Sequence, residues 1–504
     1  MYRYFSRLIL INIIFLLSGC HSNISNFNIP QFVKPNDGGI LQINIQDTKG
    51  FNFGSYSLRV ERKNSKGDFV REKPLYSTAY GTSSTFQFLG ALPPGNYRVI
   101  DVIFHGGGYT HYLNMTLLGE FEIQKGKLTH LGTLFKSDDS EQVSYGIGSS
   151  SVFFWGHKAC SQDLVCDKQA NNKSLLKQYF PKFMSLLTEP EGYLTWTRLS
   201  KRVATLKFIR QEYLKVDNLS LSKDGFFYYG KAGLLFDAKN KIQLETNTTT
   251  EIIAAVKLKN SSYLFSSELG GLFHSNNKKL SLINPPLNTG RIVNLSKTGN
   301  IITAVHLERG VFRIFQTQIG SWNLWQERFQ FKNSLNSFLV TDRASEFEKL
   351  NSFFVSEDNN NIYISYLNNV FVVFDKHSGK AILNEYKFDI EDVYKGDNDL
   401  INVAEPYSVL RMGRLIHISR DLGKTWKTIK NLNTKIAPIQ GENNKFYTLF
   451  FDEHDEKIDW LVETVDFESW KKIDDHSNIC SQFTHNEMVK LKMTKCLPVF
   501  NVQF

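Results

Sequence analysis

Beyond its first twenty residues, this 504-residue sequence lacks any apolar run that approaches the roughly 20 residues needed to cross a bilayer as a helix. It also lacks runs of five or six like charges, and its formal charge of +9 is small for its length. A nucleic-acid surface or a polybasic lipid-binding patch is therefore not indicated. Cysteine is scarce, with five residues and no C-x-x-C spacing. No residues are spaced as a catalytic motif requires, so we predict no cofactor and no metal.

The composition is that of a folded protein. Hydrophobic residues make up 41% of the chain and charged residues 22%. Aromatic residues reach 13%, with 40 Phe and 21 Tyr, and this enrichment favours strands over helices. The length exceeds that of one compact domain. We therefore expect an all-β protein of two or three domains.

The N-terminus has the features of an export signal. Arg3 and Arg7 form a positive start, and residues 8–17 (LILINIIFLL) form an apolar segment too short to span a bilayer permanently. The sequence Leu-Ser-Gly-Cys ends at Cys20 and resembles the lipobox of bacterial lipoproteins. The alternative is an ordinary secretory signal followed by a chance cysteine.

The lipobox resemblance implies that residues 1–19 are removed and that Cys20 carries acyl chains, which give stable membrane attachment. Removal of Arg3 and Arg7 leaves 57 basic and 50 acidic residues, or +7. Because His21 follows, where inner-membrane lipoproteins carry Asp, the resemblance favours the outer membrane. Residues 20–37 are polar with few aliphatics and read as a flexible tether.

Four further cysteines would then sit in an oxidising compartment. They are Cys160 and Cys166, and Cys480 and Cys496. Pairing by sequence proximity is one of three possible connectivities. We predict structural disulfides, with a zinc site as the less favoured alternative because no adjacent His pair supports it.

Residues 38–137 show short alternating apolar runs broken by Gly and Pro, the pattern of a small antiparallel β-sandwich. Residues 92–97 (LPPGNY) resemble the turn of transthyretin-like and carboxypeptidase-regulatory-like domains, which implies a spacer or adhesion module. Residues 105–109 (HGGGY) lack the strand-to-helix context of a phosphate loop and predict a hairpin tip. Residues 138–193 predict a connector, in which Asn172 begins short helices that Pro181 interrupts.

A repeated pattern fills residues 194–504: an aromatic-aliphatic strand, a Gly or Asn turn, a second strand and a polar turn. Its spacing of about 40 to 45 residues is the signature of a β-propeller, and the length accommodates six or seven blades. The pattern recurs six times: 226–229 with 233–237, 263–265 with 271–275, 301–305 with 310–314, 362–364 with 369–375, 415–421, and 446–451 with 461–466.

One copy carries a sharper motif. Residues 419–426 (SRDLGKTW) match the Asp box, S-x-D-x-G-x-T-W, and so resemble sialidase-like (BNR) propellers. The resemblance implies a structural hairpin turn that begins at Ser419. In such a turn Asp421 accepts backbone N–H groups across the turn, Gly423 takes a positive φ and Trp426 packs between blades. Residues 465–470 look like a degraded second copy.

Evidence for catalysis is weaker. Sialidases use three arginines, a Tyr–Glu pair and an Asp. Residues 312–315 (FRIF) are similar to one such arginine element, but they lie in the middle of the repeat array. Alternation places Arg313 on one face of the strand and Phe312 on the other, as in any ordinary strand. Two acidic clusters, 452–456 and 389–399, could bind Ca²⁺ or act in glycoside hydrolysis, but solvated loops explain them better. An enzyme is therefore the less favoured interpretation.

The leading hypothesis is a non-enzymatic lipoprotein of the outer membrane whose propeller binds an envelope protein partner or acts as an assembly scaffold. It would lie on the periplasmic face or on the cell surface, and it would not bind nucleic acid. The alternatives are a carbohydrate-binding or sialidase-like propeller and a surface adhesin. Residues 499–504 alternate, and we predict a last propeller strand there, pinned by Cys480 and Cys496.

Overall fold

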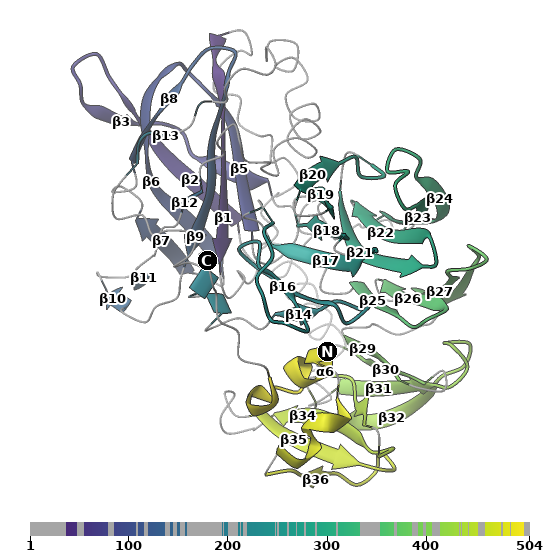
Figure 1. Cartoon of the computed structure of the whole chain (residues 1–504). Coiled ribbons are helices and arrows are strands. Elements are labelled where there is room, and N and C mark those ends of the chain that lie inside the picture. The colour runs from purple at the N-terminus through teal and green to yellow at the C-terminus, as the bar shows by residue number, and fades with distance from the viewer. Residues whose placement is uncertain are drawn as a thin grey trace, which may run out of the picture.

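A computed structural model shows a nearly all-β protein (Figure 1). It describes residues 37–47, 55–78, 85–106, 109–114, 119–136, 142–144, 149–151, 157–158, 194, 196–199, 210–211, 213–214, 219–246, 248, 251–259, 262–268, 270–276, 279–287, 290–308, 311–332, 353–366, 370–385, 392–396, 400–405, 414–432, 434, 436–441, 443–451, 459–474, 477–483 and 485–497. Cys20, the Cys160 and Cys166 pair, the predicted connector helices, residues 452–456 and residues 499–504 lie outside this set.

The N-terminal body is one sheet of eleven strands in the order β12-β9-β1-β5-β4-β2-β6-β8-β13, with β3 beside β2 and β7 beside β6. Because β4 pairs with both β5 and β2, it joins two halves of the sheet that share one core. The strands are β1 (Gly39–Asp47), β2 (Ser55–Lys63), β3 (Phe69–Arg71), β4 (Leu75–Thr78), β5 (Thr85–Leu92), β6 (Gly95–Gly106), β7 (Tyr109–Asn114), β8 (Gly119–Ile123), β9 (Leu128–Lys136), β12 (His157–Lys158) and β13 (Trp196–Leu199). A separate pair is formed by β10 (Gln142–Ser144) and β11 (Ser149–Ser151).

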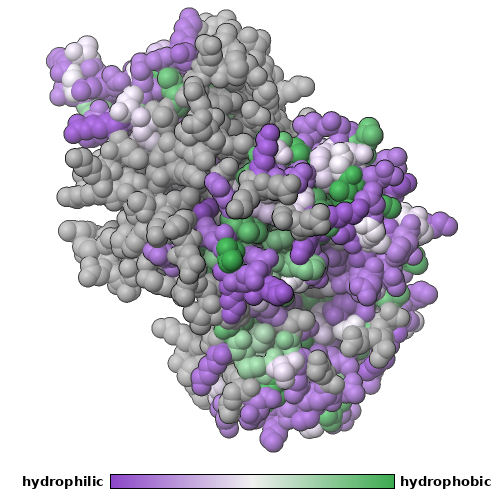
Figure 2. Space-filling model, viewed as in Figure 1, coloured by the Kyte–Doolittle hydropathy of each residue, from purple (hydrophilic) through white to green (hydrophobic). Residues whose placement is uncertain are grey.

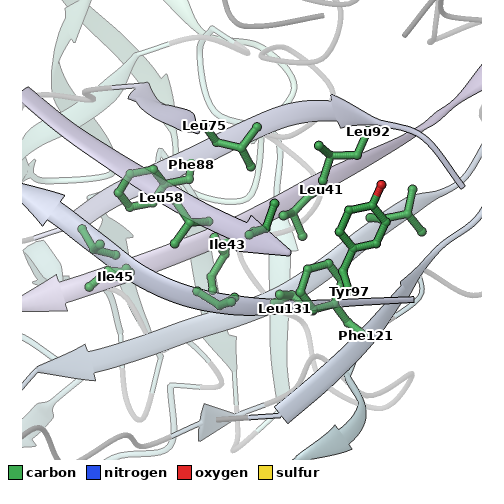
Figure 3. Packing of buried hydrophobic residues seen from close by; sticks show 14 of the residues in the cluster. Leu41, Ile43, Ile45, Leu58, Leu75, Phe88, Leu92, Tyr97, Phe121 and Leu131 are labelled. Carbon is green, nitrogen blue, oxygen red and sulfur yellow. The ribbon is translucent and has the colours of Figure 1, made fainter. Parts of the chain in front are cut away.

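Alternation along the strands builds this core. Leu41, Ile43 and Ile45 of β1 are buried together with apolar residues of the facing strands (Figure 3). Each such side chain contributes about 1.5–3 kcal/mol by leaving water. The Tyr97 ring stacks on Phe121 with centroids 5.7 Å apart, and its hydroxyl donates to the Pro93 carbonyl at 2.7 Å. The turn at 92–97 therefore ties directly into the core.

Two pairings here were not visible in the sequence. Strands β1 and β9 run parallel, whereas the other pairs are antiparallel. Strand β13 pairs with β8, and Trp196 joins the N-terminal core. Residues 196–199 thus belong to the first body, although we placed the start of the repeat array at residue 194. Alternation predicts a strand but does not say which sheet it joins.

Six antiparallel sheets follow one another from residue 220 to residue 472 (Figure 1). The first has three strands and the others four, each strand pairing with the next along the chain. The strands are β14 (Ser220–Leu221), β15 (Phe227–Tyr229), β16 (Leu235–Asp237); β17 (Ile252–Lys257), β18 (Tyr263–Ser267), β19 (Leu272–Asn276), β20 (Lys279–Ile283); β21 (Arg291–Thr298), β22 (Ile301–Glu308), β23 (Val311–Gln318), β24 (Gln326–Lys332); β25 (Phe353–Glu357), β26 (Asn361–Tyr366), β27 (Val370–Asp375), β28 (Ala381–Glu385); β29 (Asp392–Lys395), β30 (Ile401–Ala404), β31 (Arg414–Ser419), β32 (Lys427–Leu432); and β33 (Ile439–Gln440), β34 (Phe446–Phe451), β35 (Asp459–Thr464), β36 (Lys471–Lys472).

Apolar clusters bind each sheet to the next. Phe227 of the first sheet packs with Phe265 of the second, and Ile302 of the third packs with Leu264 of the second. Further clusters join the third to the fourth, the fourth to the fifth and the fifth to the sixth. Successive meander sheets packed face to face in this way form a β-propeller with six blades among the described residues. The predicted all-β class is confirmed, and the predicted repeats coincide with the second and third strands of each sheet.

The described part of the chain ends in a helical segment. It contains η3 (Ser477–Gln482), α6 (His485–Lys490) and η4 (Thr494–Cys496), and a disulfide joins Cys480 to Cys496. The predicted local pairing of these two cysteines is therefore present. Phe483, Leu491 and Met493 pack with Tyr447 and Leu449, so the segment is seated on the sixth sheet.

Candidate functional site

The axis of the ring brings together charged residues that are far apart in the sequence. Lys223 lies in the turn between β14 and β15, in the first sheet, and Glu357 ends β25, in the fourth. In a ring of six sheets the first and fourth stand opposite each other. Lys223 and Glu357 nevertheless act on each other electrostatically, and Glu357 also acts on Tyr229 of the first sheet. An interaction between opposite sheets must pass through the centre of the ring.

Glu357 is held from two sides. Its carboxylate accepts a hydrogen bond from Asn294 Nδ2 at 3.3 Å and lies 3.9 Å from Lys376 Nζ. Lys376 in turn donates to the Asp358 carbonyl at 2.5 Å, which fixes the amine beside the carboxylate. Burial raises the pKa of Glu357 above its usual value, while Lys376 and Asn294 oppose that rise. The carboxylate is therefore fixed in place, but the neighbouring groups offset only part of the cost of burying its negative charge.

Lys223 combines two properties that seldom occur together. Its side chain is exposed to water, yet desolvation by the surrounding protein lowers the pKa of its amine. Glu357 and Glu487 raise that pKa, whereas the amine of Lys490 lowers it further. Both properties are met where a side chain is open to solvent on one side and surrounded by protein atoms on the others. Perturbed groups in such surroundings are candidates for binding or chemistry.

Helix α6 lies at this axis and closes the ring. His485 Nε2 donates to the Leu219 carbonyl at 2.6 Å, beside β14. The Asn486 amide bonds to Leu221 of β14, and Lys490 Nζ donates to the Val393 carbonyl of β29 at 3.3 Å. The helix thus connects the first sheet to the fifth while resting on the sixth. Burial lowers the pKa of His485, which favours the neutral ring.

The turn at residues 419–426 joins β31 to β32 at the edge of the fifth sheet. Asp421 Oδ1 accepts the Thr425 N–H at 2.9 Å, and the Ser419 hydroxyl donates to it at 2.8 Å. These bonds lower the pKa of Asp421 to about 2, the Thr425 side chain having the largest effect. Gly423 has φ +84°, and Trp426 packs with Phe371 of the fourth sheet.

Related turns recur around the ring. Asp466 accepts the N–H groups of Glu468 and Ser469 at 2.9 and 3.0 Å, within residues 465–470, which resemble a degraded Asp box. Asp375 likewise accepts the N–H groups of His377 and Ser378, both at 2.8 Å. Each carboxylate is occupied by its own turn. These turns are structural elements at sheet edges and do not reach the axis cluster.

Arg313 does not lie at the axis. It is on β23, the third strand of its sheet, and its guanidinium bonds to Gln330 at 3.4 Å and lies 3.6 Å from Glu327, both on β24. Phe312 and Ile314 on either side are buried, as alternation predicts. The geometry gives Arg313 no role in gripping a carboxylate substrate at the centre.

A second polar network lies inside the fifth sheet. His417 Nε2 is 2.8 Å from Glu405 Oε1, and its Nδ1 is 3.0 Å from the Thr428 hydroxyl. The order hydroxyl–imidazole–carboxylate is that of a hydrolase relay. These residues come from adjacent strands of one sheet, however, and His417 and Glu405 are largely buried. The network therefore cross-links the sheet.

The remaining sequence predictions concern metal binding, membrane spans and the acidic clusters. Within the part of the chain that is described, no three His, Cys, Asp or Glu residues are grouped to hold a metal ion, and no helix is long and apolar enough to span a membrane. Of the acidic cluster at 389–399, Asp392 opens β29, while Asp389, Glu391, Asp397 and Asp399 lie outside the described residues. Sequence reasoning missed Lys223, Glu357 and Lys490, because no local pattern shows that these segments meet.

No protein-family model matches this sequence, and no curated protein matches it. Similar solved structures include YCF48 bound to D1 peptide, at 10% identity and a TM-score of 0.33, covering 49% of this chain and 78% of that one. Oligogalacturonate lyase from Vibrio parahaemolyticus aligns at 8% identity and 0.33, covering 52% and 77%. A prolyl endopeptidase aligns at 9% identity and 0.34, covering 51% and 41%.

Proposed function

We propose that this chain is a non-catalytic lipoprotein of the bacterial envelope, anchored through Cys20, whose propeller presents a rigid axial face to a protein partner. The BNR-type character of the propeller and the transthyretin-like character of the first body belong to the same proposal. Attachment at the outer membrane would confine the search for a partner to the membrane surface.

The observation that carries the proposal is the locking of the two bodies. Gln46, which is fully buried near the end of β1, accepts the Ala232 N–H of the first propeller sheet at 2.8 Å through its side chain. The Gln46 carbonyl also accepts the Tyr213 hydroxyl at 3.2 Å. Nearby, buried Arg210 donates to the carbonyls of Ala232 and Thr248. A propeller fixed at its base offers a preorganised surface, which reduces the entropic cost of binding a partner.

The axis cluster supplies the chemistry of recognition. The amine of Lys223 and the carboxylate of Glu357 act on each other electrostatically, so a partner that inserts a side chain near them would meet both signs of charge. Charge pairs of this kind set specificity and association rate more than total affinity. A sialidase-like reaction is less well supported, because Arg313 lies on a third strand.

The binding proposal is tested by recovery of partners from detergent-solubilised envelopes with the full lipidated chain. We expect a specific envelope protein to be retained by the unaltered chain and lost with Lys223→Glu. Lys239→Glu is the matched control, because Lys239 is an exposed lysine at the outer turn of the same sheet. Recovery of no protein, or equal recovery with both variants, would contradict an axial binding face.

The anchor is tested separately. Labelling of growing cells with an alkyne-bearing fatty acid should mark the unaltered chain and not Cys20→Ser. The variant should also leave the membrane fraction. An unlabelled chain that is cleaved after the apolar segment would show the ordinary secretory signal instead.

A further inference from the structure

Two surface segments on neighbouring propeller sheets are joined into one platform, which we define as Asn284, Trp322, Asn323, Leu324 and Trp325. Asn284 follows β20 of the second sheet, and the other four lie in the turn between β23 and β24 of the third. Asn284 Nδ2 donates to Asn323 Oδ1 at 2.9 Å. Trp325 Nε1 donates to the Asn284 carbonyl at 3.2 Å. The platform therefore bridges two sheets on the outside of the ring.

The third-sheet turn is rigid. Gly320 takes φ +92°, a conformation that favours glycine. The Ser321 N–H donates to the Gln318 carbonyl and the Leu324 N–H to the Ser321 carbonyl, both at 2.9 Å. The Thr317 hydroxyl donates to the Ser321 carbonyl at 2.8 Å. On the other side, the prolines at 285 and 286 restrict the backbone after Asn284.

The aromatic side chains of the platform are only partly covered. Trp322 and Trp325 pack on the apolar cluster between the second and third sheets, but each remains partly exposed. Leu324 between them is 71% exposed. The Trp322 ring also lies 5.3 Å from the ring of His274, whose pKa burial lowers, so the ring is neutral near pH 7. The platform thus carries no charged side chain and exposes indole and leucine surface, on a propeller whose visible face is mostly hydrophilic (Figure 2).

The two amides add directed hydrogen-bonding capacity. The bond between Asn284 and Asn323 uses one donor and one acceptor. It leaves Asn284 Oδ1 as an acceptor and Asn323 Nδ2 as a donor, and both residues are exposed. Neither atom has a protein partner among the described residues. An acceptor and a donor are therefore held side by side at the edge of an aromatic surface.

We propose that this platform binds a neutral hexopyranose unit of a glycan. A sugar ring has an apolar C–H face that packs on indole rings, and neighbouring hydroxyls that both donate and accept hydrogen bonds. An aromatic surface with a few fixed polar groups meets both requirements. The site is remote from the ring axis and goes beyond the proposed protein-binding function.

The experiment is a titration of the full chain with two soluble trisaccharides, maltotriose and triacetylchitotriose, followed by calorimetry and tryptophan fluorescence. We expect one of them to bind. Trp322→Ala should weaken binding at least about tenfold, and Asn323→Leu about three- to tenfold, the range expected for one hydrogen bond. Trp460→Ala is the matched control, because Trp460 is also exposed, at 39%, but lies on the sixth sheet beside Lys472.

Each outcome decides the proposal. Binding that is lost with Trp322→Ala and Asn323→Leu, and kept with Trp460→Ala, supports it. Because Asn323→Leu retains the tryptophans, it separates loss of recognition from loss of the aromatic surface. Failure of both sugars to bind, or binding that all three variants retain, would overturn it. Cross-linking of the platform to a protein, with no sugar bound, would assign the surface to a protein partner instead.

Discussion

The side-chain amide of Asn486 pairs with the main chain of Leu221 in both directions. Its Nδ2 donates to the Leu221 carbonyl at 2.9 Å, and its Oδ1 accepts the Leu221 N–H at 2.8 Å. The two residues are 265 positions apart. A single side chain therefore occupies the free edge of β14, where a neighbouring strand would otherwise bond. Helix α6 therefore closes the ring through one side chain that makes the hydrogen bonds of a neighbouring strand.

Asn486→Leu should destabilise the propeller, because the N–H and carbonyl of Leu221 would both lose their partner. Two such losses at a partly buried position amount to about 1–3 kcal/mol. Chemical unfolding measured by tryptophan fluorescence would show the change. Asn240→Leu is the control, since Asn240 is exposed in an outer turn. Equal stability of the two variants would mean that α6 does not close the ring.

The disulfide between Cys480 and Cys496 encloses α6, so it restrains the segment that closes the ring. The double variant Cys480→Ser, Cys496→Ser should lower the free energy of unfolding by about 3 kcal/mol, the value for a loop of about 15 residues. Reductant should destabilise the unaltered chain by more than it destabilises the double variant, which keeps only the predicted Cys160 and Cys166 pair. A chain that is insensitive to reductant at both melting temperature and proteolysis would contradict this.

Asp421 should make stability depend on pH. Because its pKa in the folded state is lowered to about 2 from a usual 3.8, its contribution is full above about pH 4 and is lost as the pH falls toward 2. Asp421→Asn should be less stable than the unaltered chain at pH 6, and the difference should shrink below pH 4. Urea unfolding at several pH values measures it. A difference that stays constant with pH would show that the charge is not involved.

The Lys223 amine should titrate below a usual lysine, and Glu357→Gln should lower its pKa further, because Glu357 raises it. NMR of ¹³C-methylated lysines can follow the titration. Glu327→Gln removes a carboxylate on the outer strand β24 and should leave the Lys223 signal unchanged. If Glu357→Gln also had no effect, the two residues would not share the ring axis.

Gln46→Leu should loosen the junction between the two bodies. The Ala232 N–H would be buried without an acceptor, which costs about 1–3 kcal/mol. Calorimetry should show a lower and broader transition, as the sandwich and propeller begin to unfold separately. Gln318→Leu makes the same exchange at an exposed position of β23 and should have little effect.

Local patterns predicted the repeating part of the fold. The hairpin at 263–265 and 271–275 became β18 and β19, because alternation and a Gly turn specify an antiparallel pair without help from the rest of the chain. The Asp turns were visible for the same reason, since every bond of Asp421 is made within four residues. Structure that depends only on neighbouring residues can therefore be predicted from a single sequence.

Long-range partners were not predicted. Nothing near Trp196 indicates that it will reach across to β8, and nothing near Lys490 indicates that it will bond to Val393, 97 residues away. The C-terminal disulfide encloses α6, which the sequence did not predict, while the predicted strand at residues 499–504 lies outside the described residues. A six-residue helix with no amphipathic repeat gives too little signal to be distinguished from a turn.

Strand β1 begins at Gly39, directly after the proposed tether, and its far end holds Gln46 against the first blade. Nine extended residues measure about 30 Å at roughly 3.3 Å each. The strand therefore links the start of the first body to the propeller, in addition to forming part of the core. The distance between the start of β1 and the first blade is fixed by the strand, while the proposed tether before it would leave the orientation of the ring free.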